Sequence, residues 1–394
     1  MKILKIRACG LQLLKKEIEI DFFAKQRVQP EKNEMLTNVF SNIYINNVMS
    51  VVGINASGKT TTLKIISFVL QMLQNKPINA IEYKDILNGL QDQDVACFEV
   101  YFISEDEKLK KLETCIKVNI ETEQFERKYF ITSEKIWSKS LKSRHTKTDL
   151  YNFSQSDLET ERNDKELFLL DDVSVIIAFN KKQKEQLFVI DSIDWTNING
   201  LRVLGDFPIT LVRFLDPSIE YLVCKQDELS DKKLEMHLKF FERKEIVLHS
   251  PSEVNKYLSS GTIKGINIFM TAIVALQKGG YIIIDELENH FNKEIVSTLI
   301  RFFMDKEVNK SGAVLIFSTH YVELLDIFER NDNIFVVKNK GGITLENLAD
   351  LLKRNDVKKS ELFQSGYLEC TTPSYESYIN FKRAITKLPE ANEV

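Results

Sequence analysis

A glycine-rich run that contains one lysine has the spacing that most directly suggests chemistry. Residues 53–60 read GINASGKT and match G-x-x-x-x-G-K-[ST] at every fixed position. Gly53 and Gly58 permit backbone angles that turn N–H groups toward phosphate oxygens. Lys59 adds a cation for the terminal phosphates, and the Thr60 hydroxyl is placed to ligate Mg²⁺. On its own the run predicts a nucleotide phosphate site, because kinases, GTPases and helicases share it. The expected contacts are Gly53, Asn55, Ser57, Gly58, Lys59, Thr60 and Thr61.

Two neighbouring acids follow an apolar run further along the chain. Asp285 and Glu286 come directly after residues 281–284, YIII, which have the composition of a buried strand. One carboxylate at the end of such a strand can hold Mg²⁺, and the next can polarise an attacking water. We therefore assign Asp285 to the metal and Glu286 to the general base. The alternative is a pair of acids that begins an ordinary surface turn, and the phosphate loop upstream disfavours it.

A histidine closes a second apolar run. Residues 312–319 read GAVLIFST, and His320 follows them. Ligands of open α/β sheets bind at the carboxyl ends of the strands, where this imidazole would stand. It could hydrogen-bond the terminal phosphate or the attacking water. A lone histidine is more often structural, but its place downstream of the carboxylates favours a role in catalysis.

A second phosphate-binding element is predicted where two serines and a glycine precede an apolar stretch. Ser259, Ser260 and Gly261 stand before a helix expected at 263–276, and a helix N-terminus has free N–H groups that attract anions. One phosphate does not need both this element and Lys59 from the same subunit. We therefore predict a head-to-tail dimer in which each chain caps the nucleotide of the other. The alternative is that Ser259 is an ordinary helix N-cap.

Strands that alternate with helices must position these residues. Residues 46–53 predict a short strand, and 61–74 have helical spacing. Helix, strand, helix, strand and strand are then expected at 263–276, 279–286, 293–305, 312–320 and 333–339. This alternation predicts an α/β fold with a mostly parallel sheet, of the P-loop NTPase class, in which a mixed sheet surrounds the phosphate loop.

The chain is expected to form one composite nucleotide-binding unit. Its three segments are an N-terminal segment with the phosphate loop, an inserted α/β lobe and a C-terminal segment with the serine turn, the acids and the histidine, at 1–95, 96–250 and 251–394. The strand and helix signals are clear in the first and last segments. They are mixed in the middle one, which alternates apolar strands with charged connections.

Composition sets further bounds. The chain has 394 residues, 43% hydrophobic content and a net charge of −4, so it can bury a sizeable core and is not basic overall. Five cysteines without a C-x-x-C pair predict neither a disulfide framework nor a zinc ribbon. The N-terminal residues lack a signal-peptide core, and the longest apolar stretch, 266–276, is shorter than the roughly 20 residues that a bilayer needs. We expect a cytoplasmic protein with no membrane partner.

One segment, residues 135–147, is locally basic. It holds Lys135, Lys139, Lys142, Arg144 and Lys147 around Trp137. Phosphate contacts combined with a stacking aromatic can bind a nucleic-acid strand. A solvated loop or a partner surface is the alternative that we favour, and DNA stays open as a partner.

In chain order, the four motifs GINASGKT, LSSGT, IIIDELE and FSTH resemble the ABC-type ATPase head of SMC and RecF proteins. The resemblance is closest to bacterial AAA family ATPases of the abortive-infection (AbiEii-like) and OLD-like group. It covers residues 1–80 and 210–360. It implies that ATP and Mg²⁺ are bound, that residues 259–262 form the signature, and that Glu286 and His320 are the general base and the switch histidine.

The resemblance also implies a role. Such proteins act in anti-phage defence, where ATP hydrolysis by a dimer of heads or a higher oligomer regulates a separate effector, a nuclease or a toxin. A RecF-like or SMC-like ATPase of DNA repair or recombination, acting directly on DNA, is the alternative. Two residues depart from the pattern, since Thr262 replaces a glutamine and Ser260 a glycine. No Q-loop glutamine can be chosen among Gln71, Gln74, Gln91 and Gln93.

Overall fold

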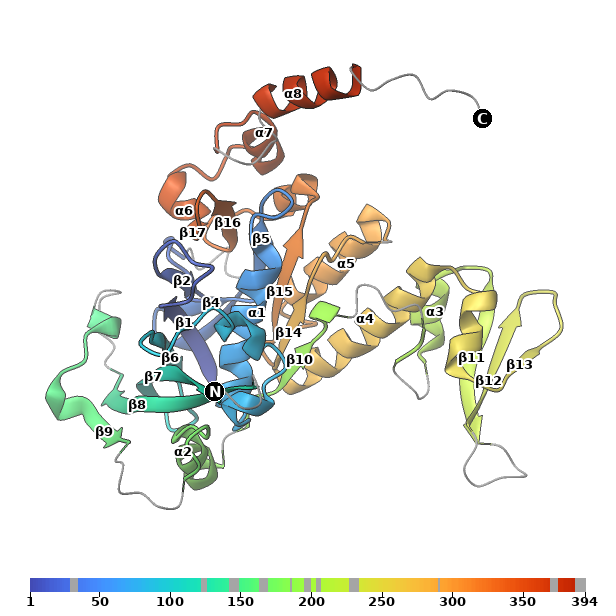
Figure 1. Ribbon diagram of the computed structural model, residues 1–394. Helices are drawn as coiled ribbons and strands as arrows, with labels where there is room; N and C mark the ends of the chain where they lie inside the picture. The colour runs from blue at the N-terminus through green and yellow to red at the C-terminus, as the bar shows by residue number, and fades with distance from the viewer. Residues whose placement is uncertain are drawn as a thin grey trace.

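Two six-stranded sheets make up the body of the protein, as a computed structural model shows, and a smaller three-stranded sheet projects from it (Figure 1). The structure describes residues 1–28, 35–121, 126–141, 149–162, 169–184, 186–194, 200–202, 207–226, 234–289, 291–368 and 375–386. Within these ranges, no helix has the length and apolar character that crossing a membrane requires.

The first six-stranded sheet carries the predicted motifs at one edge. Its order is β10-β14-β15-β5-β16-β17, in which the first five strands are parallel and β17 is antiparallel. The strands are β5 (Val48–Val52), β10 (Val189–Asp191), β14 (Tyr281–Ile284), β15 (Val314–Thr319), β16 (Ile334–Asn339) and β17 (Ile343–Asn347). Parallel strands end at the same edge, so the residues that follow β5, β14 and β15 meet there. The predicted α/β fold with a mixed sheet around the phosphate loop is confirmed.

Helices cover both faces of this sheet, which explains why its strands are apolar throughout. Ile283 of β14 belongs to the core that contains α1 (Lys59–Leu73). Its neighbour Ile282 faces the opposite core, formed with α4 (Ser260–Lys278) and α5 (Lys293–Met304). The same alternation along β5, β15 and β16 fixes the register of the sheet against both helical layers.

The second six-stranded sheet is antiparallel and covers α1 from the other side. Its order is β2-β1-β6-β7-β8-β9. The strands are β1 (Lys2–Cys9), β2 (Ile18–Asp21), β6 (Ala96–Ile103), β7 (Lys108–Glu121), β8 (Glu126–Ser140) and β9 (Leu158–Glu161). Phe68 of α1 packs on Phe98 of β6, with ring centroids 5.1 Å apart. Because α1 is enclosed between two sheets, the phosphate loop at its N-terminus has a rigid support.

The three-stranded sheet forms a separate core with the first half of α4. It consists of β11 (Ile219–Gln226), β12 (Leu234–Phe240) and β13 (Ile246–Leu248), flanked by α3 (Ile209–Leu215). Ile263 and Ile266 of α4 are buried in this core, whereas residues further along α4 pack on the parallel sheet. The helix therefore joins the projecting lobe to the body (Figure 1).

The remaining elements are short. The other helices and strands are β3 (Leu36–Phe40), β4 (Ile43–Asn46), α2 (Ile176–Gln183), α6 (Leu348–Leu351), α7 (Lys359–Gln364) and α8 (Tyr375–Thr386). The 3-10 helices are η2 (Ile78–Ala80), η3 (Lys84–Leu87), η4 (Asp149–Tyr151), η5 (Gln155–Asp157), η7 (Pro251–Lys256) and η8 (Val322–Ile327). The three-segment division of the chain stays a prediction. Its middle segment, 96–250, contributes strands to all three of the sheets above.

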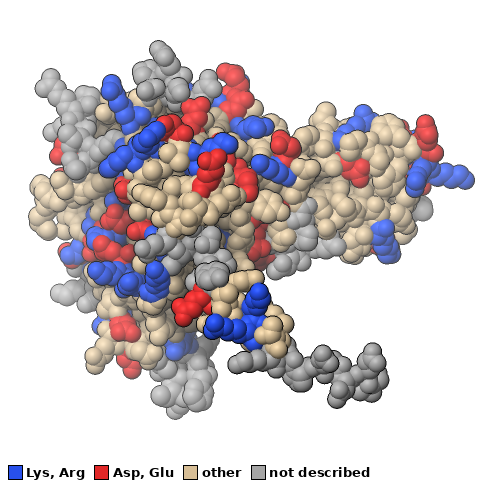
Figure 2. Space-filling model, turned by 90° about the horizontal axis from the view of Figure 1, so that it is seen from above, with Lys and Arg blue, Asp and Glu red and all other residues tan. Residues whose placement is uncertain are grey.

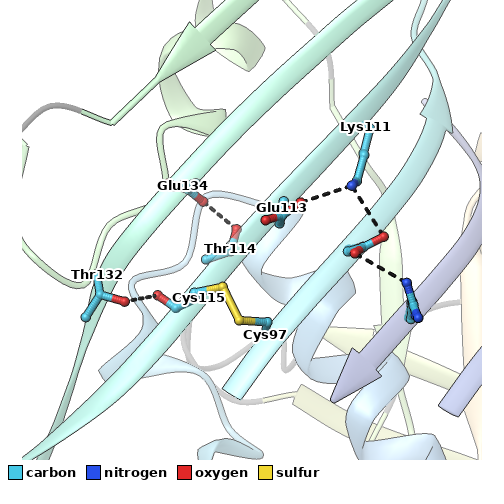
Figure 3. Close-up of a disulfide and its surroundings, with 9 residues drawn as sticks. Cys97, Lys111, Glu113, Thr114, Cys115, Thr132 and Glu134 are labelled. Atoms are coloured by element: carbon cyan, nitrogen blue, oxygen red, sulfur yellow. Dashed lines mark hydrogen bonds and ion pairs between the residues drawn. A yellow bond between two sulfur atoms is a disulfide. The ribbon is translucent and has the colours of Figure 1, made fainter. Parts of the chain in front are cut away.

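A disulfide joins the two strands β6 and β7, which the sequence analysis did not anticipate. Cys97 and Cys115 lie directly opposite each other, 4.2 Å apart at Cα, and their sulfurs are bonded (Figure 3). The expectation that the cysteines form no disulfide is therefore wrong for this pair. The pairing depends on the register of two strands, and the spacing of the cysteines along the chain does not reveal it. Cys9 and Cys224 are free thiols, and Cys370 lies outside the described residues.

Candidate nucleotide site

The phosphate loop connects β5 to α1 in the strand–loop–helix context that the motif requires. Gly58 precedes the first helical residue with φ +104°, and a Cβ at this position would lie 2.6 Å from the side chain of Ile343. A Cβ on Gly53 would lie 2.6 Å from the carbonyl oxygen of Val337. Both glycines are therefore required by close packing against β16 and β17, and Gly58 also by its backbone angle.

Two side chains of the loop point into it. The Lys59 Nζ donates to the carbonyl oxygens of Gly53 and Ile54, at 2.9 and 3.1 Å. Burial lowers the pKa of Lys59 below the ordinary lysine value, and nearby carboxylates, Asp285 foremost, act in the opposite direction. The Ser57 Oγ is buried and has no hydrogen-bond partner among the described residues. A phosphate oxygen could accept hydrogen bonds from both side chains.

The two predicted metal ligands meet across the sheet edge. The Thr60 Oγ1, on α1, donates to the Asp285 Oδ2 at the end of β14, at 2.7 Å. The other oxygen of Asp285 accepts a hydrogen bond from the Ser318 Oγ of the neighbouring strand β15, which fixes the orientation of the carboxylate. Mg²⁺ prefers hard oxygen donors and uses one or two carboxylates together with substrate phosphates. A hydroxyl and a carboxylate side by side, next to a phosphate loop, fit that ion.

Glu286 is held in an unusual backbone conformation beside these ligands. Its φ is +45°, in the left-handed region that a glutamate rarely adopts. Its N–H donates to the Ser318 Oγ at 2.8 Å, so one serine hydroxyl positions both consecutive acids. The side chain remains 45% exposed and can accept a proton from water. Such strain persists where the surroundings fix it, and it accords with a positioned functional residue.

His320 lies between the lysine and the glutamate. Its Nδ1 is 3.4 Å from the Lys59 Nζ, and its Nε2 is 3.6 Å from the Glu286 Oε1. The backbone N–H of His320 donates to the Glu288 Oε1. Sequence analysis missed the role of Glu288, although the spacing D-E-x-E placed a second acid two residues after Glu286. The structure buries Glu288 and uses it to hold the histidine.

These residues surround one cavity of about 460 Å³. Its lining is Leu13, Asn55, Ala56, Ser57, Gly58, Lys59, Thr60, Thr61, Glu286, His320, Asn339 and Ile343. All of the predicted phosphate-loop contacts except Gly53 are in this set. Leu13 and Ile343 were missed, because they come from a turn after β1 and from β17. Backbone hydrogen bonds of 2.8 and 3.0 Å tie Ile343 to Leu13 and Lys15, which brings this apolar pair to the cavity.

The predicted signature does not line the cavity of its own chain. Ser259 is the N-cap of α4, and its Oγ accepts from the Thr262 N–H at 3.0 Å. Ser259 and Ser260 are exposed, and Gly261 is half-buried. Thr262 hydrogen-bonds the N-cap hydroxyl at 2.8 Å. The helix end is thus capped, and it presents its first turn to the outside of the chain.

None of the four candidate Q-loop glutamines lines the cavity. Gln71 and Gln74 lie along α1, where they bond to Ser67 and to the Leu187 carbonyl at 2.9 and 3.1 Å. Gln91 and Gln93 lie in the turn before β6. Strand β14 pairs with β15 on one side and with β10 on the other. The sequence analysis did not predict β10, which residues 192–194 follow. The Q-loop therefore stays unassigned.

The predicted basic segment is only partly described. Lys142, Arg144 and Lys147 lie outside the described residues. Lys135 forms an ion pair with Glu161 at 3.0 Å, and Lys139 donates to the Asp149 carbonyl at 2.8 Å. Both cations are thus engaged within the chain. Figure 2 shows positive and negative side chains intermixed over one face of the protein. A solvated loop or a partner surface stays the favoured interpretation of this segment, and DNA stays open as its partner.

The fold and the cavity define a P-loop NTPase. The profile of one protein family, described as "AAA domain, putative AbiEii toxin, Type IV TA system", matches residues 48–326, more than half of the chain. The chain belongs to this family, and the resemblance to AbiEii-like AAA family ATPases is confirmed. At this coarse level it is a nucleotide-binding ATPase domain. No curated protein matches the sequence.

Proposed function

We propose that the chain binds and hydrolyses ATP as an ABC-type head, working as a head-to-tail dimer or higher oligomer that regulates a separate effector in anti-phage defence. The observation that carries the catalytic part is the convergence of Lys59, Glu286 and His320 on one cavity, next to the Thr60–Asp285 pair. The family description supports the coarser statement that the domain is an ATPase.

The cavity supplies the groups that phosphoryl transfer to water needs. Lys59 and the N–H groups of the phosphate loop bind the phosphates. Thr60 and Asp285 would hold Mg²⁺, which when bound neutralises charge on the phosphate oxygens. Glu286 accepts a proton from the attacking water at its carboxylate. His320, held by Glu288, stands where it can hydrogen-bond that water or the terminal phosphate.

The direction in which the signature faces supports the proposed dimer. Residues 259–261 are absent from the lining of the cavity and their hydroxyls are accessible. A helix N-terminus of this kind favours an anion, and a second chain could supply the anion as its bound nucleotide. The same contact would place the signature turn of the second chain against the cavity. Hydrolysis would then depend on assembly.

The effector is the least direct part of the proposal. The family description names a putative toxin of a toxin–antitoxin system, and such a system includes a second protein as a partner. We expect the nuclease or toxin that it regulates to be another chain. An ATPase that acts directly on DNA would instead show hydrolysis stimulated by DNA.

Two substitutions test the catalytic assignment. Lys59→Ala is expected to lose ATP binding, measured with a fluorescent nucleotide. Glu286→Gln is expected to bind ATP as the wild type does and to lose phosphate release by about 10²-fold or more. Normal hydrolysis by Glu286→Gln would exclude Glu286 as the general base. Binding retained by Lys59→Ala would show that the nucleotide occupies another site.

A further inference from the structure

A buried lysine lies in the second turn of α4, directly behind the predicted signature. Lys264 is 5% exposed, and its Nζ donates to the carbonyl oxygen of Asn289 at 2.9 Å. The same nitrogen lies 5.5 Å from the ring centroid of Phe291. No other hydrogen bond of this amine occurs within the described part of the chain. A buried cation is costly, so a side chain that served only to fill space would be apolar.

The loop that Lys264 contacts carries the catalytic acids. Residues 285–291 begin with Asp285 and Glu286 and contain Glu288, which holds the N–H of His320. The Asn289 N–H donates to the Glu286 carbonyl at 2.9 Å, and the Phe291 N–H donates to the Glu288 carbonyl at 3.0 Å. A shift of the Asn289 carbonyl therefore moves the backbone of Glu286 and Glu288 with it.

The electrostatics strengthen this link. Burial lowers the pKa of Lys264 to about 8, and the carboxylates of Glu288, Glu286 and Asp285 oppose that shift in this order. The ammonium thus lies within the field of all three acids of the loop, of which Glu286 lines the cavity. The Glu288 Oε2 is buried without a hydrogen-bond partner in the described residues, so the lysine is a nearby source of positive charge for it.

We propose that Lys264 is a positioning residue that couples two nucleotide sites. It connects the signature turn, residues 259–261, to Glu286 and His320 of its own chain. When the signature of one chain contacts the nucleotide of the partner, the movement of α4 reaches the catalytic loop through the Lys264–Asn289 hydrogen bond. Each site then hydrolyses ATP fastest when the other is occupied. This inference rests on the proposed dimer.

A mixed dimer of two differently tagged chains separates coupling from simple support of the loop. The reporting chain keeps Glu286, and the partner chain carries Glu286→Gln, so only one site hydrolyses ATP. Lys264→Met is placed on the reporting chain, and Lys59→Ala, which empties the other site, is placed on the partner. The rate per mixed dimer, counted by native mass, is measured for all four combinations, together with the ATP affinity of the reporting site.

We expect each change alone to lower the rate by about tenfold. Lys264→Met removes the charge-assisted hydrogen bond to Asn289, and the empty partner site removes the contact that acts through this bond. The two changes together should lower it no further, and the ATP affinity should stay unchanged. Lys278→Met on the reporting chain is the control. Lys278 lies at the other end of α4, 4.6 Å from the ring centroid of Phe188, and its loss should leave the effect of the empty partner site intact.

Two results would overturn the inference. Losses that multiply to about a hundredfold would mean that Lys264 supports the loop without transmitting the state of the other site. An unchanged rate for Lys264→Met would mean that it does neither. If the tagged chains form no dimer in ATP, the proposed assembly itself fails and this inference falls with it, an outcome that the mass measurement identifies separately.

Discussion

Ser318 offers a sharp test of how the site is built. Its Oγ donates to the Asp285 carboxylate and accepts from the Glu286 N–H at 2.8 Å, and the residue is fully buried. Ser318→Ala removes both hydrogen bonds without adding volume. The Glu286 N–H loses this acceptor, and a buried group without its partner costs about 1–3 kcal/mol. We expect Tm to fall by about 1–4 °C in a chain of 394 residues.

The catalytic effect should exceed the effect on folding. Without the hydroxyl, Glu286 can relax from its φ of +45°, and the carboxylate leaves the direction of the attacking water. We expect kcat to fall by about tenfold or more while the affinity for ATP stays within about threefold. Steady-state phosphate release and nucleotide titration measure the two quantities.

The matched control removes a buried hydroxyl elsewhere. The Thr271 Oγ1 donates to the Asn267 carbonyl at 2.6 Å within α4, so Thr271→Val loses a similar hydrogen bond away from the acids. This control should show a comparable change in Tm and a normal kcat. If Ser318→Ala also keeps a normal kcat, the serine does not orient the acids, and the argument from their geometry is wrong.

Two more predictions concern the loop and the stability of the fold. Gly58→Ala places a methyl group 2.6 Å from Ile343 at a φ of +104°, so we expect weaker ATP binding and lower Tm, with Gly200→Ala, which has open space, as control. Burial lowers the pKa of Lys2 to about 8, below its unfolded value. Between pH 8 and about 10 the unfolded chain therefore holds the proton that the folded chain releases. The cost of burying the charged amine is lost over this interval, so the free energy of unfolding rises with pH. The difference in unfolding free energy between wild type and Lys2→Met should change over that interval, and a constant difference would contradict the reasoning.

The candidate site residues that could be predicted are those whose positions depend on local sequence. The phosphate loop at 53–60, the acids at 285–286 and His320 each follow a short apolar run. A parallel sheet brings the ends of such strands to one edge, so spacing along the chain was enough to expect them together. Their contacts in the structure match that expectation, from Thr60 with Asp285 to His320 with Glu286.

The parts that could not be predicted depend on pairing between distant segments. Leu13 reaches the cavity because its turn bonds to β17, and Ser318 orients the acids because β15 lies next to β14. Leu13 belongs to no motif, and Ser318 lies in the FSTH motif, in which only His320 was assigned a role. The strand β10 is only three residues long, and the opposition of Cys97 and Cys115 depends on strand register. Sequence patterns report local periodicity, and they contain little information on which strands pair.

The central claim is that two chains complete one another's nucleotide site. Native mass spectrometry of Glu286→Gln, expressed with its neighbouring genes and held in ATP and Mg²⁺, tests it most directly. The account predicts an even-numbered oligomer that retains ATP, accompanied by a second polypeptide, and its dissociation when Ser259→Arg blocks the signature turn. A monomer whose mass is unchanged by ATP would contradict the composite site.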